Sequence, residues 1–352
     1  MQPRFIIKTH TKSLRPGNYS ILISKCTSPD RSSYPENVEK RLAEFLEKSV
    51  AKYTVLVATK KNRGFGFLLD NMIWSWKGHV INTVLKYIGK SSYDKSAYFE
   101  LSKIEKIAYL KYFLETEGAL ILKLAEKFID RKEITYSYLK NEIQNIFREI
   151  YEGYMDIAPD FRSRIKIREQ LKETQRRIKS REHTYDQGTL AHKIKPHIQA
   201  LSDLQLLTIE KENQEEIYKP VIYNGISPFA VFYKKLANFK KMEEIFSNDG
   251  YFSLIAEALN LRPIKYSPKM HEKTLRLAFT WGYEVMRNKT TGMADIEALI
   301  DWSCIKLLSE ENVLITRRDI EEFLNEMRKV NPSSIRYHVD GKGRIAYLIL
   351  EL

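Results

Sequence analysis

The sequence predicts a mainly α-helical protein of several domains, with an N-terminal α/β part and two units in which helices lead into a β-hairpin. Apolar residues recur at helical spacing through most of residues 101–352, and two segments there change to the alternating pattern of strands. The length of 352 residues suits two or three domains. With 43% hydrophobic and 29% charged residues, the composition is that of a globular chain and excludes a disordered one.

The N-terminal part, residues 1–100, mixes strand and helix patterns. Residues 19–25, 53–58 and 64–69 are short apolar runs that predict strands. Apolar residues at helical spacing predict helices near residues 38–50 and 80–88. We therefore expect a basic α/β domain here.

The middle part, residues 101–225, begins with Ser102 and Glu105 at capping-box spacing and continues as helices that Gly118 interrupts. A very basic helix is expected over residues 161–181, and a further helix, which contains Pro196, over residues 190–204. Two alternating runs then flank a polar tip at residues 211–215, which predicts a β-hairpin over residues 207–222.

The C-terminal part, residues 226–352, is predicted to be a helical domain that also ends in a hairpin. Asp295 is expected to cap one helix, and Thr316 with Asp319 has the spacing of a second capping box. Large apolar residues occur at every second position over 335–339 and again over 345–349, and residues 340–343 between them are typical of a turn. This is the clearest hairpin pattern in the chain.

The charge balance favours a polyanionic partner and excludes an acidic-tail protein. The 58 Lys and Arg residues exceed the 45 Asp and Glu residues, and residues 1–100 hold 17 of the former against 8 of the latter. Residues 162–181 hold nine basic and two acidic residues. Four of these cations recur at every fourth position and predict a basic ridge on one helix: Arg164, Arg168, Lys172 and Arg176. The ridge would fit duplex DNA, and the alternative is a solvated linker helix.

Two segments, residues 185–223 and 294–352, share a plan of short helices, an amphipathic helix and a hairpin with a polar tip. This plan resembles the winged-helix variant of the helix-turn-helix. In that family the third helix often enters the major groove and the hairpin, or wing, touches the backbone.

Carried over by position, the resemblance implies that each unit presents a set of DNA contacts. The first unit would present Lys193, Lys195, His197 and Gln199. The second would present Arg317, Arg318, Arg328 and Lys329 from its helix and Lys342 and Arg344 from its wing. Acidic residues outnumber Lys211 on the first wing, which favours packing or protein contact for that hairpin. Both units could also serve as protein-binding or architectural modules.

A second nucleic-acid pattern lies at residues 63–70, which read Arg-Gly-Phe-Gly-Phe-Leu-Leu-Asp. This string is similar to the RNP1 signature of RNA-recognition motifs, in which exposed aromatic rings stack on bases. The resemblance implies RNA as a partner and a ferredoxin-like fold, with Lys60, Lys61 and Arg63 as backbone contacts. The alternative is a glycine-rich strand that buries Phe65 and Phe67.

No phosphate-binding loop, nucleophile elbow or paired zinc-ligand motif occurs in the chain, so we expect neither a cofactor nor a metal. The one catalytic alternative is a metal-dependent nuclease, for which carboxylates of the N-terminal part would hold Mg²⁺. The candidates are Asp70, Asp94, Glu100 and Glu105.

The chain has two cysteines, no signal-peptide pattern and no apolar run long enough to span a bilayer. These features predict a cytoplasmic protein without membrane contact, and association with the nucleoid is the alternative that DNA binding would bring. The leading hypothesis is a non-enzymatic protein that binds double-stranded DNA, such as the DNA-gripping subunit of a replication or antiviral defence complex. The alternatives are a protein-binding adaptor and the nuclease.

Overall fold

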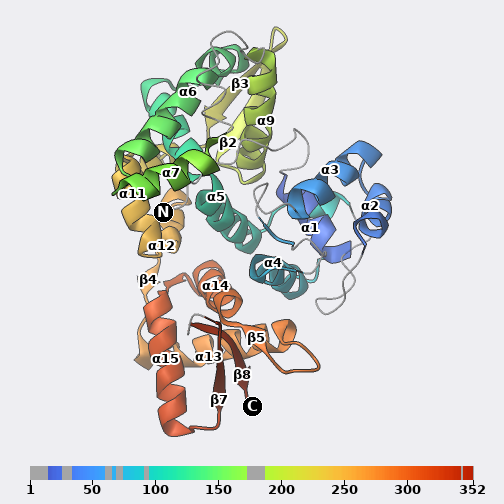
Figure 1. The fold of residues 1–352 in the computed structure, drawn as a ribbon, viewed down its shortest axis with the longest axis vertical. Coiled ribbons are helices and arrows are strands. Elements are labelled where there is room, and N and C mark those ends of the chain that lie inside the picture. The colour runs from blue at the N-terminus through green and yellow to red at the C-terminus, as the bar shows by residue number, and fades with distance from the viewer. Residues whose placement is uncertain are drawn as a thin grey trace. The chain divides into compact units, whose positions relative to one another are not determined.

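The computed structural model describes residues 15–25, 34–59, 66–68, 74–90, 95–172, 187–341 and 344–351. Helices make up most of these residues, and the strands are short (Figure 1). None of the helices in these ranges combines the length and the apolar composition that crossing a bilayer requires. The predicted mainly α-helical class is confirmed.

The chain forms two compact units that are not consecutive in sequence. The first unit consists of Met1–Pro16, Asn62–Phe65 and Tyr109–Asn260, and the second of Gly17–Lys61, Gly66–Ala108 and Leu261–Leu352. Helix α5 (Lys103–Asp130) therefore contributes residues to both units.

The first unit builds helices around a three-stranded antiparallel sheet. Its helices besides α5 are α6 (Tyr136–Asp156), α7 (Phe161–Gln170), α9 (Gln187–Asp203), α10 (Pro228–Leu236), α11 (Phe239–Ser247) and α12 (Tyr251–Ala258). Its strands are β1 (Ile134–Thr135), β2 (Leu207–Glu212) and β3 (Glu215–Pro220), in the sheet order β1-β3-β2. The β2–β3 hairpin, hereafter the first wing, turns at Asn213 and Gln214, both of which have positive φ.

The second unit contains helices from both ends of the chain and a sheet of the same design. Its helices are α1 (Pro16–Lys25), α2 (Pro35–Ala43), α3 (Lys48–Thr59), α4 (Trp76–Tyr87), α13 (Pro268–Met286), α14 (Ile296–Lys306) and α15 (Arg317–Val330). Its strands are β4 (Ile264–Lys265), β5 (Ala294–Asp295), β6 (Val313–Leu314), β7 (Ile335–Val339) and β8 (Ile345–Leu350). The order β5-β8-β7 forms an antiparallel sheet, while β4 and β6 pair in parallel.

The same sequence of elements occurs in both units: a helix, a two-residue strand, a helix, a third principal helix and a hairpin. In each, the two-residue strand pairs with the last strand of the hairpin. Both predicted hairpins are confirmed, with Ile209 opposite Tyr218 in the first and Tyr337 opposite Leu348 in the second.

A tryptophan orders the core of the second unit. Trp302 of α14 is fully buried, and its Nε1 donates a hydrogen bond to the Ala278 carbonyl oxygen at 2.8 Å. A Cβ atom at Gly282 would lie 2.4 Å from the indole, so only glycine permits this approach of α13 to α14. The rings of Tyr87 and Trp281 pack at 5.6 and 5.0 Å from Trp302 and join α4 to the same core.

The predicted helix caps are confirmed. They could be predicted because a cap depends only on polar residues a few positions apart in the sequence. Glu105 accepts a hydrogen bond from the Ser102 backbone N at the start of α5, and Thr316 with Asp319 forms a capping box on α15. The predicted interruption at Gly118 is confirmed to within one residue, because α5 is kinked at Glu117, whose φ of −125° and ψ of 22° lie outside the helical region.

Two of the strands predicted in the N-terminal part are wrong. Residues 19–25 lie in α1 and residues 53–58 in α3. Leu68 of the third predicted strand forms only an isolated bridge with Trp74. Helix α1 buries Tyr19, Ile21 and Leu22 together, and a short helix that is apolar on several faces has the same composition as a buried strand.

The carboxyl of Asp295, which caps α14, makes the stability of the second unit depend on pH. Burial, with the nearby Glu297 and Asp301, raises the pKa of Asp295 from 3.8 to about 6. The folded state therefore holds this proton more tightly than the unfolded state, so the stabilisation is present below pH 4 and is lost as the pH rises towards 6.

We expect Asp295→Asn to raise the free energy of unfolding at neutral pH, by on the order of 1–3 kcal/mol, because asparagine caps as well as aspartate and carries no buried charge. Denaturant unfolding at a series of pH values measures it. The difference between variant and wild type should shrink as the pH falls from 6 to 4. A difference that does not change with pH would contradict the assignment.

Candidate nucleic-acid interface

Helix α7 is fixed to the first unit by one polar cap and one apolar face. The Asp160 carboxylate accepts a hydrogen bond from the Ser163 backbone N at 2.6 Å and begins the helix. Ile167 and Leu171 are buried, and α7 packs against α6 (Figure 1). The polar residues of α7 consequently face outward.

Five cations of this segment are exposed, and none of them forms an ion pair with an acidic residue of the described chain. They are Arg162, Arg164, Lys166, Arg168 and Lys172, hereafter the α7 cations. Phe161 lies beside them with 74% of its surface exposed. Cations that lie within one or two helical turns repel each other, and binding of a polyanion would relieve that repulsion.

The basic helix differs from its prediction in length. Helix α7 ends at Gln170 and Leu171 has a non-helical φ/ψ, so the continuous helix expected over residues 161–181 is wrong. Arg164, Arg168 and Lys172 are exposed as predicted, while Arg176 lies outside the described residues. Arg162 and Lys166 were missed because the prediction followed only one four-residue repeat.

Helix α9 presents fewer cations than the resemblance implied. The Lys195 ammonium lies 2.6 Å from the Glu216 carboxylate of the first wing, and Gln199 is half-buried. His197 is buried, 3.2 Å from Glu117, so its expected exposure is wrong. Lys193 is on α9, but its side chain lies outside the described part.

The acidic residues of the first wing make contacts within the unit. Glu210 pairs with Lys219 at 2.6 Å, and Glu216 pairs with Lys195. Glu215 accepts hydrogen bonds from Ser137 at the start of α6. These contacts show that three glutamates of the first wing have partners within the unit itself.

In the second unit most of the predicted cations lie next to carboxylates of the same unit, while Arg328 is exposed and lies over the ring of Tyr337, 4.9 Å from its centroid. Arg317 pairs with Glu297, Arg318 with Glu322 at 2.8 Å, and Arg344 with Asp340 at 3.1 Å. Exposed pairs of this kind contribute little to stability, but they neutralise the charge that a phosphate would need. Lys342, like Lys60, Lys61 and Arg63 of the N-terminal part, is outside the described residues.

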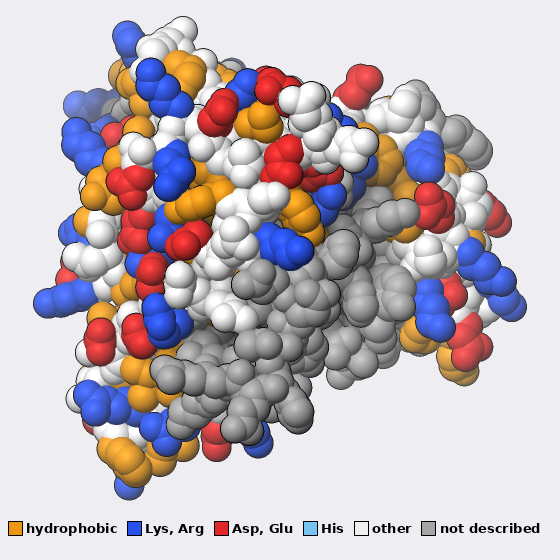
Figure 2. All heavy atoms as spheres, turned by 90° about the horizontal axis from the view of Figure 1, so that it is seen from above, with side chains coloured by type: hydrophobic (Ala, Val, Ile, Leu, Met, Phe, Trp, Pro, Cys, Tyr) orange, Lys and Arg blue, Asp and Glu red, His pale blue; other side chains and the backbone are white. Residues whose placement is uncertain are grey.

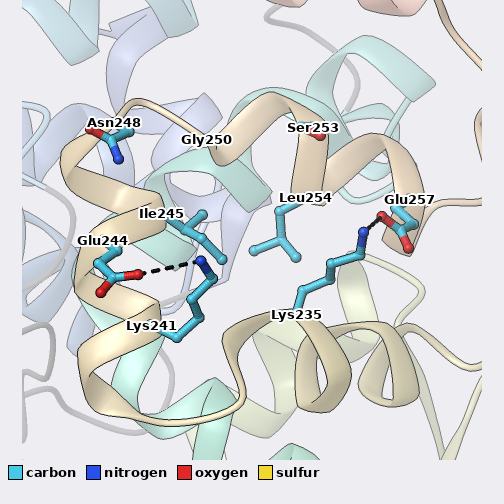
Figure 3. Close-up of a pocket in the computed structure, with 9 residues that line it drawn as sticks. All are labelled: Lys235, Lys241, Glu244, Ile245, Asn248, Gly250, Ser253, Leu254 and Glu257. Carbon is cyan, nitrogen blue, oxygen red and sulfur yellow. Dashed lines mark hydrogen bonds and ion pairs between the residues drawn. The ribbon is translucent and has the colours of Figure 1, made fainter.

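Surface charges of both signs are interspersed on the face shown in Figure 2. A depression of about 420 Å³ between α10, α11 and α12 is likewise lined by side chains of both charges. Its two lysines are paired, Lys235 with Glu257 at 2.8 Å and Lys241 with Glu244 at 3.3 Å (Figure 3). This depression therefore offers no unneutralised cation to an anion.

The described carboxylates of the nuclease alternative do not form a metal site. Glu105 is buried, and its carboxylate binds Lys90 at 2.7 Å and the Ser102 backbone N at 2.9 Å. Glu100 is exposed, and Asp70 and Asp94 lie outside the described residues. No group of three potential ligands occurs among the residues that the structure covers.

The four strands that an RNA-recognition motif needs have no counterpart in the described ranges between residues 15 and 100, which form helices and one isolated bridge. Phe67 is buried against Tyr19, with ring centroids 5.1 Å apart. Phe67 therefore packs in the core rather than presenting its ring to a base.

Comparison with known proteins gives no relative: no family model, no curated protein and no solved structure matches the chain.

We expect Glu105→Ala to lower the free energy of unfolding by roughly 3–5 kcal/mol, because the ammonium of Lys90, whose side chain is 7% exposed, would lose its partner carboxylate. Urea unfolding measures it. Glu100→Ala, at an exposed position, is the control and should change stability by less than about 0.5 kcal/mol. Equal stabilities of the two variants would contradict a structural role for Glu105.

Proposed function

We propose that the protein binds nucleic acid, with double-stranded DNA as the preferred ligand, through the first unit. The observation that carries this proposal is the group of α7 cations, which are exposed and without ion-pair partners among the described residues. Each phosphate that such a cation neutralises releases counterions from the nucleic acid, and this release drives binding.

The order of elements supports a winged-helix interpretation of both units. Sheet orders β1-β3-β2 and β5-β8-β7 place the two-residue strand beside the last strand of the wing. In a winged helix the third helix is the one that enters the major groove, which corresponds to α9 in the first unit and α15 in the second. Helix α7 lies in the connection between α6 and α9, packs against α6, and would add backbone contacts of its own.

A second function, protein contact, fits the second unit better than DNA contact does. Its candidate cations Arg317, Arg318 and Arg344 are paired. Apolar side chains are exposed at the end of α15 and on the β7–β8 hairpin, among them Val330 at 87%, Val339 at 64% and Tyr347 at 45%. Paired charges around exposed apolar residues are typical of protein interfaces. The chain would then hold DNA with one unit and a partner protein with the other.

The proposal predicts that replacing both Arg164 and Arg168 by glutamine weakens duplex binding roughly ten-fold or more at low salt. It also predicts that the slope of log K against log salt concentration becomes shallower by about two, because two phosphate contacts are lost. Gel-shift or anisotropy titrations with duplex DNA, single-stranded DNA and RNA across salt concentrations measure both quantities.

The matched control replaces Arg318 and Arg344 of the second unit by glutamine, which removes the same total charge from positions that are already paired. This control should bind as the wild type does. Equal losses in both double variants would mean that only net charge matters. A wild type that does not bind duplex even in dilute buffer, and that co-purifies with a protein, would replace the proposal with the adaptor function.

A further inference from the structure

The first wing carries its carboxylates where the proposed function, on which this inference rests, would place nucleic acid. Glu210, Glu212, Glu215 and Glu216 stand on the wing against Lys211 and Lys219. A solvated acidic wing would repel phosphate. Three of these glutamates, however, are held on donors of the unit itself: Glu210 on Lys219, Glu215 on Ser137 and Glu216 on Lys195.

Glu216 is bound tightly to α9. One of its oxygens lies 2.6 Å from the Lys195 ammonium, and the other accepts a hydrogen bond from the Tyr218 hydroxyl at 3.0 Å. Burial would raise the pKa of Glu216, but these two hydrogen bonds outweigh it and hold the pKa below its ordinary value. The carboxylate therefore stays ionised.

Glu215, the neighbouring residue, is bound to the start of α6. It accepts hydrogen bonds from the Ser137 backbone N at 2.6 Å and from the Ser137 hydroxyl at 2.9 Å. The two contacts adjoin each other, since Lys195 also lies over the ring of Tyr136, with its Nζ 5.4 Å from the ring centroid.

The groups that donate hydrogen bonds to these carboxylates are of the kinds that donate to phosphate in protein–DNA complexes. A lysine ammonium, a hydroxyl and a backbone N–H at a helix start are common donors to phosphate oxygens. The Lys195 side chain keeps 31% of its surface exposed and that of Glu216 17%, so the pair lies at the edge of the unit, within reach of solvent.

We infer that Glu216, with Glu215, occupies a phosphate-binding site of the first unit that is formed by Lys195 and Ser137. Nucleic acid and the wing then compete for the same donors. The wing lowers the affinity of the unit until a phosphate displaces the carboxylate from Lys195.

The test is Glu216→Gln, with Glu212→Gln as the matched control. Both remove one negative charge from the same wing, but Glu212 is exposed and forms no ion pair within the described chain. Titration with duplex DNA from about 50 to 200 mM salt should show that Glu216→Gln steepens the salt slope by about one and raises affinity several-fold above that of Glu212→Gln. Adding Lys195→Gln to Glu216→Gln should abolish that gain.

Thermal unfolding of each variant checks that the wing stays folded, and Glu215→Gln tests the second carboxylate independently with an expected smaller gain. If Glu216→Gln behaves as Glu212→Gln does, or if its gain survives the loss of Lys195, the inference is wrong. The proposed function would still stand if the α7 variants lose affinity in the same assay. If neither the wild type nor Glu216→Gln binds at low salt, both are wrong.

Discussion

Pairing of surface cations with carboxylates of the same unit is the constraint that decides which parts of this protein can bind a polyanion. The chain has 13 more basic than acidic residues, yet most of the described cations near the two hairpins have a carboxylate within ion-pair distance. The α7 cations differ because Ile167 and Leu171 anchor their helix by its apolar face, and these cations form no ion pair with the carboxylates of the described residues. Net charge alone does not distinguish the surfaces whose cations are paired from the α7 surface.

The two units show how one order of elements can carry two surface chemistries. Both use a two-residue strand to hold the hairpin against the helices, and in both the interior is aliphatic and aromatic. These interior residues hold each unit together, so the surface residues of the two units can differ in charge without changing the fold. The first unit has an additional basic helix between its second and third principal helices. The second has a π-helical turn at Leu307–Glu311 and a short strand there.

Features set by neighbours in sequence were predictable, and features set by distant residues were not. The capping box at Thr316, the Asp295 cap and both hairpins follow from spacing over a few residues. Helices α2 and α4 were predicted from their spacing, but α1 and most of α3 were taken for strands because short apolar runs do not distinguish a buried helix from a buried strand. In the candidate interface, the pair of Arg318 with Glu322 has helical spacing and was open to prediction, whereas Lys195 and Glu216 are 21 residues apart and meet only through the fold.

The position of α7 in the connection between α6 and α9 also explains why the first wing can be acidic. A wing that reads the backbone must itself be basic, and a unit that receives its backbone contacts from another element is released from that requirement. Glutamates on β3 can then stabilise the hairpin through Lys195 and Ser137. The cations of α7 lie on a separate helix that is capped by Asp160, so the wing carboxylates do not neutralise them. Separation of the two charges onto different elements is what allows an acidic hairpin and a basic helix to coexist in one compact unit.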